Sequence, residues 1–87
     1  MNAPSLAQVE EKLKGFRPSP AFPRRLVFER QVLPFAEDEK RISLLAPPRR
    51  GDDLTPMLGY LLQKEVCWVE AEEKDVARLI KEHYGVG

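Results

Sequence analysis

Two short apolar runs, VLPFA at residues 32–36 and RISLLA at residues 41–46, are separated by only four charged residues, Glu37 to Lys40. Apolar runs of this length are typical of strands, and a four-residue connection suits a β-hairpin. Because Pro34 has no backbone N–H, we expect the first strand to have an unpaired side at that position or to carry a bulge. The sequence therefore predicts a β-hairpin near the middle of the chain.

A leucine-rich stretch follows the hairpin, after the turn-forming loop PPRRGDD. Its apolar side chains recur at the spacing i, i+3, i+4, i+7 and i+8, which is the pattern of a single helix face. We expect Asp52 or Asp53 to cap this helix, and its face to consist of Leu54, Met57, Leu58, Leu61 and Leu62. The apolar run VCWV at residues 66–69 then predicts another strand, so this part of the chain has the makeup of a βαβ crossover.

A helix is also predicted at the N-terminal end, in the stretch SLAQVEEKLKG. Ser5 and Gln8 have the spacing of a capping box, and Gly15 stands where a helix ends. The stretch RPSP then breaks regular structure. Residues 1–19 are therefore expected to form an N-terminal helix and a proline-rich linker, and the helix either packs on its own domain or swaps onto a partner.

The remaining residues, 20–87, are expected to form one small domain. Its first helix is predicted to begin near Phe22, with Pro23 tolerated in the first turn. Its last helix should run from about residue 72 to residue 84, because acidic residues in its first turn favour the positive end of the helix dipole and Gly85 follows it. Together with the strands, the order is ααββαβα, an α+β fold in which a three-stranded sheet packs against helices.

Composition narrows the class of protein. Lys and Arg together number 14, as do Asp and Glu, so the formal net charge is zero. Binding to nucleic acid through bulk positive charge would require a basic excess, so we expect no nucleic-acid partner. No apolar run approaches the ~20 residues of a spanning helix, and the N-terminus lacks the layout of a signal peptide. With Cys67 as the only cysteine, a reducing compartment is the simpler interpretation, and we expect a cytoplasmic protein.

No catalytic or metal-binding pattern stands out. The chain has no GxxxxGKS or GxxxxGKT phosphate loop, and His83 and Cys67 are its only histidine and cysteine. Cys67 could act as a nucleophile with His83 as its base, but the apolar run around Cys67 favours a buried and inert thiol. The carboxylates lie in helix or turn contexts that favour solvated faces. We therefore expect no enzymatic activity, no metal and no cofactor.

Two arginine pairs are the candidate partner-binding residues. Arg24 and Arg25 precede the hairpin, and Arg49 and Arg50 follow it. Arginine is favoured where a carboxylate must be held through two hydrogen bonds, so these pairs suit a protein partner. The alternative is that both pairs are simply solvated. Trp68 is either an anchor for binding or a core side chain, and its place in an apolar strand favours the core.

An ordered set of short motifs resembles the N-terminal domain of type II secretion and type IV pilus assembly ATPases, the general secretion pathway protein E N-terminal domain family. The motifs are VLPF at residues 32–35, APP at residues 46–48 and HYG at residues 83–85. They occur in the order of that family: a helix leading into the first motif, a turn, a strand closed by Ala-x-Pro, a helix, a strand and a final helix. The resemblance covers roughly residues 20 to 85.

The resemblance implies a regulatory and docking domain. In the secretion ATPases, such a domain binds the cytoplasmic part of an inner-membrane platform protein and couples the motor to the membrane complex. For this chain, it implies a protein partner that is either such a platform component or the ATPase core. It also implies a cytoplasmic location that is peripheral to the inner membrane through that partner, without direct membrane insertion.

Two other functions are compatible with the sequence. Some members of the family bind cyclic di-GMP through a motif that opens with Arg-Leu-Gly, and here Arg24, Arg25 and Leu26 would be the nucleotide-binding residues. Val27 occupies the glycine position, where a side chain would block close approach of the backbone to a ligand. This argues against cyclic di-GMP. The other alternative is a stand-alone adaptor that is unconnected to a motor.

Overall fold

The computed structural model describes residues 5–17, 22–48 and 53–84. Within these residues, helices and strands follow one another in the predicted order ααββαβα, so the α+β fold is confirmed. The elements are α1 (Leu6–Leu13), α2 (Arg25–Glu29), β1 (Leu33–Glu37), β2 (Arg41–Ala46), α3 (Thr55–Leu62), β3 (Glu65–Glu70) and α4 (Glu73–Tyr84).

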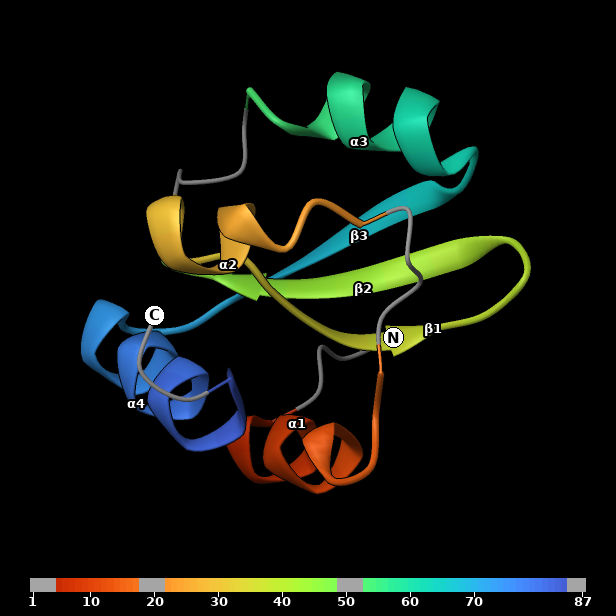
Figure 1. The fold of residues 1–87 in the computed structure, drawn as a ribbon. Coiled ribbons are helices and arrows are strands. Elements are labelled where there is room, and N and C mark those ends of the chain that lie inside the picture. The colour runs from red at the N-terminus through yellow and green to blue at the C-terminus, as the bar shows by residue number, and fades with distance from the viewer. Residues whose placement is uncertain (1–4, 18–21, 49–52, 85–87) are drawn as a thin grey trace.

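The three strands form one mixed sheet in the order β1-β2-β3 (Figure 1). β1 and β2 pair antiparallel, as the hairpin predicts, and β2 and β3 pair parallel, with Ile42 opposite Val66 and Leu44 opposite Trp68. α3 connects the two parallel strands, so the predicted βαβ crossover is confirmed. β2 is therefore the central strand, and β1 and β3 are the two edges.

The irregularity predicted at Pro34 is also present. The register between β1 and β2 shifts between Pro34 and Ala36, which leaves Phe35 as the extra residue of a bulge. Bulges and prolines both belong on edge strands, because each removes a hydrogen bond from the ladder. The position of Pro34 in the sequence thus agrees with the edge position of β1 in the sheet.

The hairpin turn is organised by the carboxylate of Asp38. Its Oδ1 accepts hydrogen bonds from the backbone N–H groups of Lys40 and Arg41 at 2.8 and 2.7 Å. These backbone hydrogen bonds lower the pKa of Asp38 from its ordinary value of 3.8, because they stabilise the ionised form. The acidic residues between the strands therefore include one with a defined structural role.

We expect the Asp38 carboxyl to titrate below pH 3.8 in the folded protein. Because its folded pKa lies below the unfolded one, the ionised group stabilises the fold above the unfolded pKa, and this contribution is lost as the pH falls through the folded pKa. The substitution Asp38→Asn keeps an acceptor oxygen but cannot titrate. Its thermal midpoint should therefore fall less than that of the wild type on acidification to about pH 2. A carboxyl titration by NMR with a midpoint at or above 3.8 would contradict this.

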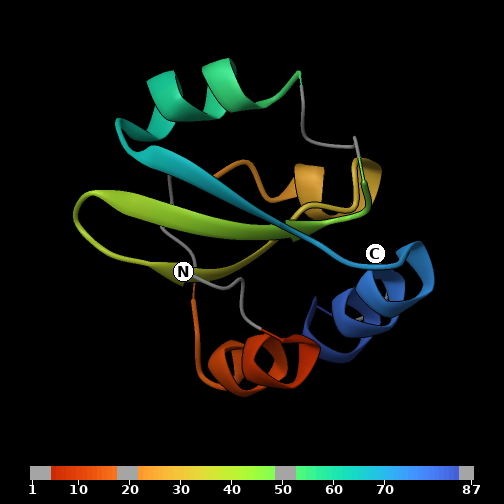
Figure 2. The same ribbon diagram turned by 180° about the vertical axis from the view of Figure 1, so that it is seen from behind.

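Helices cover both faces of the sheet. In Figure 1, α2 and α3 lie on one side of it and α1 and α4 on the other, and the reverse view in Figure 2 shows the same arrangement. α1 contacts β1, α4 contacts β2 and α3 contacts β3. The fully buried side chains between these layers include Val9, Val27, Leu33, Ile42, Leu44, Leu58, Val76 and Leu79.

The N-terminal helix is part of this core. Its predicted capping box is confirmed, since the Ser5 hydroxyl accepts a hydrogen bond from the Gln8 backbone N–H and the Gln8 side chain accepts one from the Ser5 N–H. Gly15 follows the helix with a φ of 78°, a conformation that favours glycine. Val9 and Leu13 are buried. Of the two arrangements compatible with the sequence, α1 packs on its own sheet.

Two details of the helices differ from the sequence prediction. α2 begins at Arg25 rather than near Phe22, and Phe22 is instead a buried residue ahead of it. Asp53 does not cap α3: the N-cap is Leu54, which forms no side-chain cap, and Asp53 binds Arg30 instead. The other proposed cap, Asp52, lies outside the described residues.

The apolar stripe of α3 is only partly buried. Leu54, Leu58 and Leu62 are buried, as predicted, whereas Met57 and Leu61 are exposed. The predicted burial of Cys67 is confirmed only in part, because this residue is partly buried. β3 is an edge strand, so its side chains pack against helices less completely than those of β2.

Candidate docking surface

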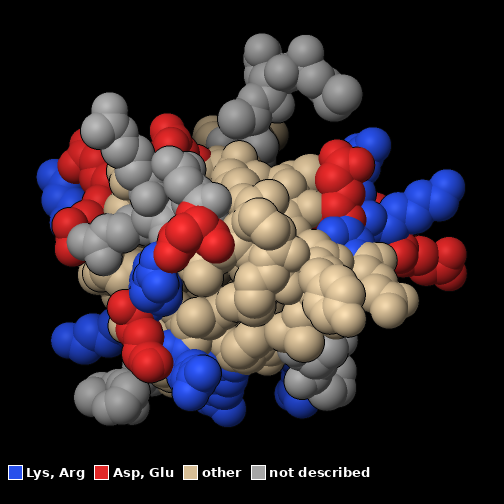
Figure 3. All heavy atoms as spheres, turned by 90° about the horizontal axis from the view of Figure 1, so that it is seen from above, with Lys and Arg blue, Asp and Glu red and all other residues tan. Residues whose placement is uncertain are grey.

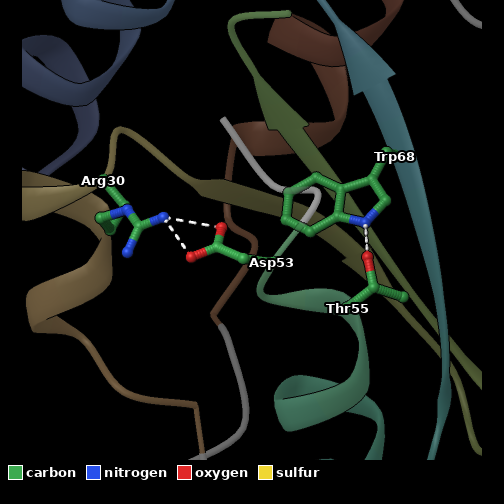
Figure 4. Close-up of polar contacts among 4 residues, drawn as sticks. All are labelled: Arg30, Asp53, Thr55 and Trp68. Atoms are coloured by element: carbon green, nitrogen blue, oxygen red, sulfur yellow. Dashed lines mark hydrogen bonds and ion pairs between the residues drawn. The ribbon is translucent and has the colours of Figure 1, made fainter. Parts of the chain in front are cut away.

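The start of α3 is tied to the end of α2 by an ion pair. One guanidinium nitrogen of Arg30 donates to both carboxylate oxygens of Asp53, at 2.7 and 2.8 Å (Figure 4). The hydrogen bond from Arg30 lowers the pKa of Asp53. Both side chains are partly exposed, so the pair contributes little stability. Its effect is to fix where the loop enters α3.

A second contact ties α3 to β3. The indole N–H of Trp68 donates to the hydroxyl of Thr55 at 2.7 Å (Figure 4). The Trp68 side chain is partly buried and packs against the core, so the predicted core position holds in part. Since a buried indole N–H usually needs a partner, this hydrogen bond sets the distance and rotation of the first turn of α3 over the sheet. α3 is thus held by both neighbouring elements.

With this rotation, α3 turns large apolar side chains to solvent. Met57 is 42% exposed, Tyr60 87% and Leu61 45%. Their spacing of i, i+3 and i+4 places them on one side of the helix, and we refer to these three residues as the α3 face. Seen from the side of α2 and α3, the molecule has a broad uncharged area with charged side chains around its margin (Figure 3).

The α3 face was not anticipated from the sequence, although a signal for it exists. The pattern of apolar residues in this helix is wider than one buried stripe, because Tyr60 adds to the five predicted positions. A helix that is apolar around most of its circumference either lies inside a large core or has a second apolar contact. Because Met57, Tyr60 and Leu61 are exposed, the width of the apolar pattern agrees with a second apolar contact.

The first predicted arginine pair lies at the start of α2, on the same side of the sheet as α3 (Figure 1). Both side chains are exposed. The guanidinium of Arg24 lies 5.8 Å from the centre of the Tyr84 ring, and Phe28 meets the same ring edge-on at 6.3 Å. Burial raises the pKa of Tyr84. Arg24 is thus held against the end of α4 by a cation–π contact, whereas Arg25 has no such contact among the described residues.

The other predicted binding residues are placed differently. The second arginine pair, Arg49 and Arg50, lies outside the described residues. Leu26, proposed for nucleotide binding, is buried in the core, and Val27 after it is fully buried. Leu26 and Val27 therefore pack inside the domain, and a nucleotide could contact only the side chains of Arg24 and Arg25 in this motif.

The chemistry around Cys67 is limited. Its side chain lines an open groove of about 520 Å³ between α1 and the sheet, together with Gln8, Glu11, Lys12, Phe35, Ser43 and Val69. His83 is not among the described residues that line this groove. No group of three His, Cys, Asp or Glu side chains within the described ranges is arranged to hold a metal ion. None of the described helices is long and apolar enough to cross a membrane.

Comparison with known proteins found no matching family model, no matching curated protein and no matching solved structure. The geometry of the chain itself therefore carries the functional argument. Within the described residues, the most prominent feature of that geometry is an exposed apolar face on a firmly positioned helix.

Proposed function

We propose that this chain is a non-catalytic protein-interaction domain of the type found at the N-terminus of type II secretion and type IV pilus ATPases. It would act in the cytoplasm and dock onto the inner-membrane platform component, with the ATPase core as the other candidate partner. The observation that carries this proposal is the α3 face. The order of the elements, which is the order expected for the resemblance, is compatible with it.

The α3 face has the properties of a protein-binding site. Exposed clusters of large apolar side chains are uncommon on small monomers and mark interaction surfaces. Tyrosine and methionine are enriched at interface centres, because they bury much area with few polar groups to desolvate. α3 is positioned by Arg30–Asp53 and Trp68–Thr55. Little ordering entropy is therefore lost when a partner binds to it.

The charges near this face indicate the chemistry of the partner. Arg24 and Arg25 are exposed on the same side of the sheet as α3. An apolar patch flanked by carboxylates would complement a surface that combines apolar side chains with arginines. We therefore infer that the partner presents an apolar helix or strand surface with acidic residues beside it.

The test is a titration of this chain with the purified cytoplasmic domain of the platform protein from the same secretion or pilus system, followed by calorimetry. We expect saturable binding, and we expect the double substitution Met57→Gln and Leu61→Gln to weaken it at least about tenfold. Glutamine keeps the helix propensity and removes the apolar contact. The charge reversal Arg24→Glu with Arg25→Glu should weaken binding less and mainly slow association.

Ala77→Gln serves as a matched control, because it places the same side chain at an exposed position of α4. Its affinity should equal that of the wild type. Equal binding by the α3 double variant would refute the choice of face, and absence of binding by the wild type would refute the platform partner. Binding to the ATPase core would assign the other partner, and saturation by cyclic di-GMP would favour the receptor alternative. If none of the three binds, the adaptor alternative is left.

A further inference from the structure

The outer edge of β3 is open within the described part of the chain. β3 pairs with β2 on one side only, and the N–H groups of Glu65 and Ala71 donate to Lys40 and Ala46 on that side. Because bonding in a parallel ladder alternates along the strand, Val66, Trp68 and Glu70 turn their backbone N–H and C=O groups outward. In the view of Figure 2, no described helix crosses in front of β3.

The two edges of the sheet differ in how they are protected. β1 contains Pro34 and a bulge, and both interrupt pairing with a further strand. β3 has no proline, no glycine and no bulge, and its register with β2 is regular over six residues. Its four central residues are apolar and only partly buried. β3 is therefore the edge that can accept another strand.

Acidic residues at both ends of β3 determine which strand it can accept. Glu65 and Glu70 are exposed, and Glu72 and Glu73 follow closely. Arg41 lies 4.0 Å from Glu65, and Lys74 lies 3.4 Å from Glu72. All four side chains are exposed, so these ion pairs offset only part of the acidic charge. Pairing of two copies of β3 would bring two acidic edges together. Repulsion between these like charges disfavours a second copy of this chain.

The surroundings of β3 leave room for added side chains. On one face of the sheet, the groove between α1 and the sheet has Cys67 and Val69 of β3 in its floor and Gln8 and Lys12 in its wall. On the other face, β3 contributes Trp68, whose ring is held by Thr55. An added strand would thus direct alternate side chains into an open groove and alongside an indole.

From these observations we infer that β3 is a docking edge for an extended segment of a partner protein, which adds to the sheet as a fourth strand. The segment has apolar or β-branched residues at its centre and a Lys or Arg at each end. Its backbone pairs with Val66, Trp68 and Glu70, and its basic ends lie against Glu65 and Glu70. This goes beyond the proposed function, because it involves a surface other than the α3 face and the arginines of α2.

The test uses a synthetic peptide, Lys-Val-Thr-Val-Thr-Lys, titrated into the whole chain. Its two Lys side chains point to opposite faces of a strand, as those of Glu65 and Glu70 do. Trp68 is the only tryptophan and lies in β3 itself, so its fluorescence reports binding directly. We expect a saturable change with a dissociation constant below about 1 mM. Backbone amide shifts should be confined to β3 and the residues that line the groove. A peptide with Glu at both ends should bind at least about tenfold more weakly.

Two sets of variants separate pairing from charge. Exchanging Glu65→Lys and Glu70→Lys should reverse the preference, so that the Glu-ended peptide binds more tightly than the Lys-ended one. Val66→Pro removes an outward N–H without breaking a β2–β3 hydrogen bond and should weaken binding about fivefold, whereas Val66→Thr should leave it unchanged. If Val66→Pro fails to fold, a peptide N-methylated at alternate residues serves instead, and it should not bind.

Absence of saturation up to about 1 mM would overturn the inference. So would shifts that fall on α3 instead of β3, or an unchanged preference in the charge-exchanged variant. Concentration-dependent shifts at β3 without peptide would assign this edge to a second copy of the chain and would also overturn it. Substitutions in the α3 face should leave peptide binding intact. The experiments therefore distinguish a failure of the proposal for the α3 face from a failure of the proposal for the β3 edge.

Discussion

Replacing Leu58 by alanine is expected to lower the free energy of unfolding by about 3 kcal/mol. Leu58 lies in the middle of α3 and has no exposed surface, so the substitution leaves a cavity between this helix and the sheet. For a domain of this size, the loss corresponds to a fall of about 15 °C in the thermal midpoint. Urea denaturation followed by Trp68 fluorescence and thermal denaturation followed by circular dichroism both measure it.

Leu61→Ala is the matched control for this substitution. It removes the same atoms from the same helix, but Leu61 is 45% exposed and belongs to the α3 face. We expect its cost to be about 1 kcal/mol or less, because much of the leucine side chain is already in contact with water. Similar losses for the two variants would mean that α3 is rotated relative to the structure described above, and the α3 face would no longer exist as a surface.

Replacing Lys64 by methionine is expected to cost about 2 kcal/mol. The ammonium of Lys64 forms an ion pair with Glu37 at the end of β1, and the two side chains are only 21% and 10% exposed. Without Lys64, the largely buried carboxylate of Glu37 loses this ion pair while its desolvation remains. Chemical denaturation at neutral pH gives the size of the effect.

A double-mutant cycle identifies the cause of this loss. In the Lys64→Met background, Glu37→Gln removes the carboxylate charge that the lysine ammonium neutralised, so we expect it to recover at least half of the stability. Lys64→Arg keeps the charge and should cost less than Lys64→Met. If the effects of Lys64→Met and Glu37→Gln simply add, the ion pair makes no coupled contribution and the predicted loss has another origin.

Features that depend on a few neighbouring residues were predictable from the sequence. The capping box needs only Ser5 and Gln8, whose side chains bond to each other's backbone within one turn. The hairpin follows from two apolar runs and a short charged connection. Pro34 predicts an irregularity because it has no N–H to donate, wherever the strand lies. The order of the elements follows from such local signals.

Features that depend on contacts between distant residues were not predictable in the same way. Asp53 has the composition of a helix cap, but Arg30, 23 residues earlier, competes for its carboxylate and forms a stronger charge-assisted bond. α2 and α3 are followed by Gln31 and Gln63 in the left-handed conformation, without the glycine that usually marks such an end. Residue types alone therefore predicted neither the Arg30–Asp53 ion pair nor the ends of these two helices.

The candidate sites divide along the same line. Residue types indicated that Arg24 and Arg25 could lie on the surface. The apolar residues of α3 outnumber those that one buried stripe needs, which indicated that some of them are exposed. Which of the apolar residues face outward depends on how α3 packs on the sheet: Leu54, Leu58 and Leu62 are buried there, and Thr55 bonds to Trp68.

By itself, the sequence determined which segments form helices and strands, because hydrophobic period, capping and proline act over a few residues. Only the tertiary structure decided that Leu58 is buried while Leu61 is exposed, that Lys64 meets Glu37, and that β3 forms an edge which no other described strand covers. The physical reason is the sequence distance over which each interaction acts. Burial, ion pairing and strand order depend on contacts between elements that are far apart in the sequence. A sheet of three strands has two edges, and the chain's path through the βαβ crossover assigns one of them to β3.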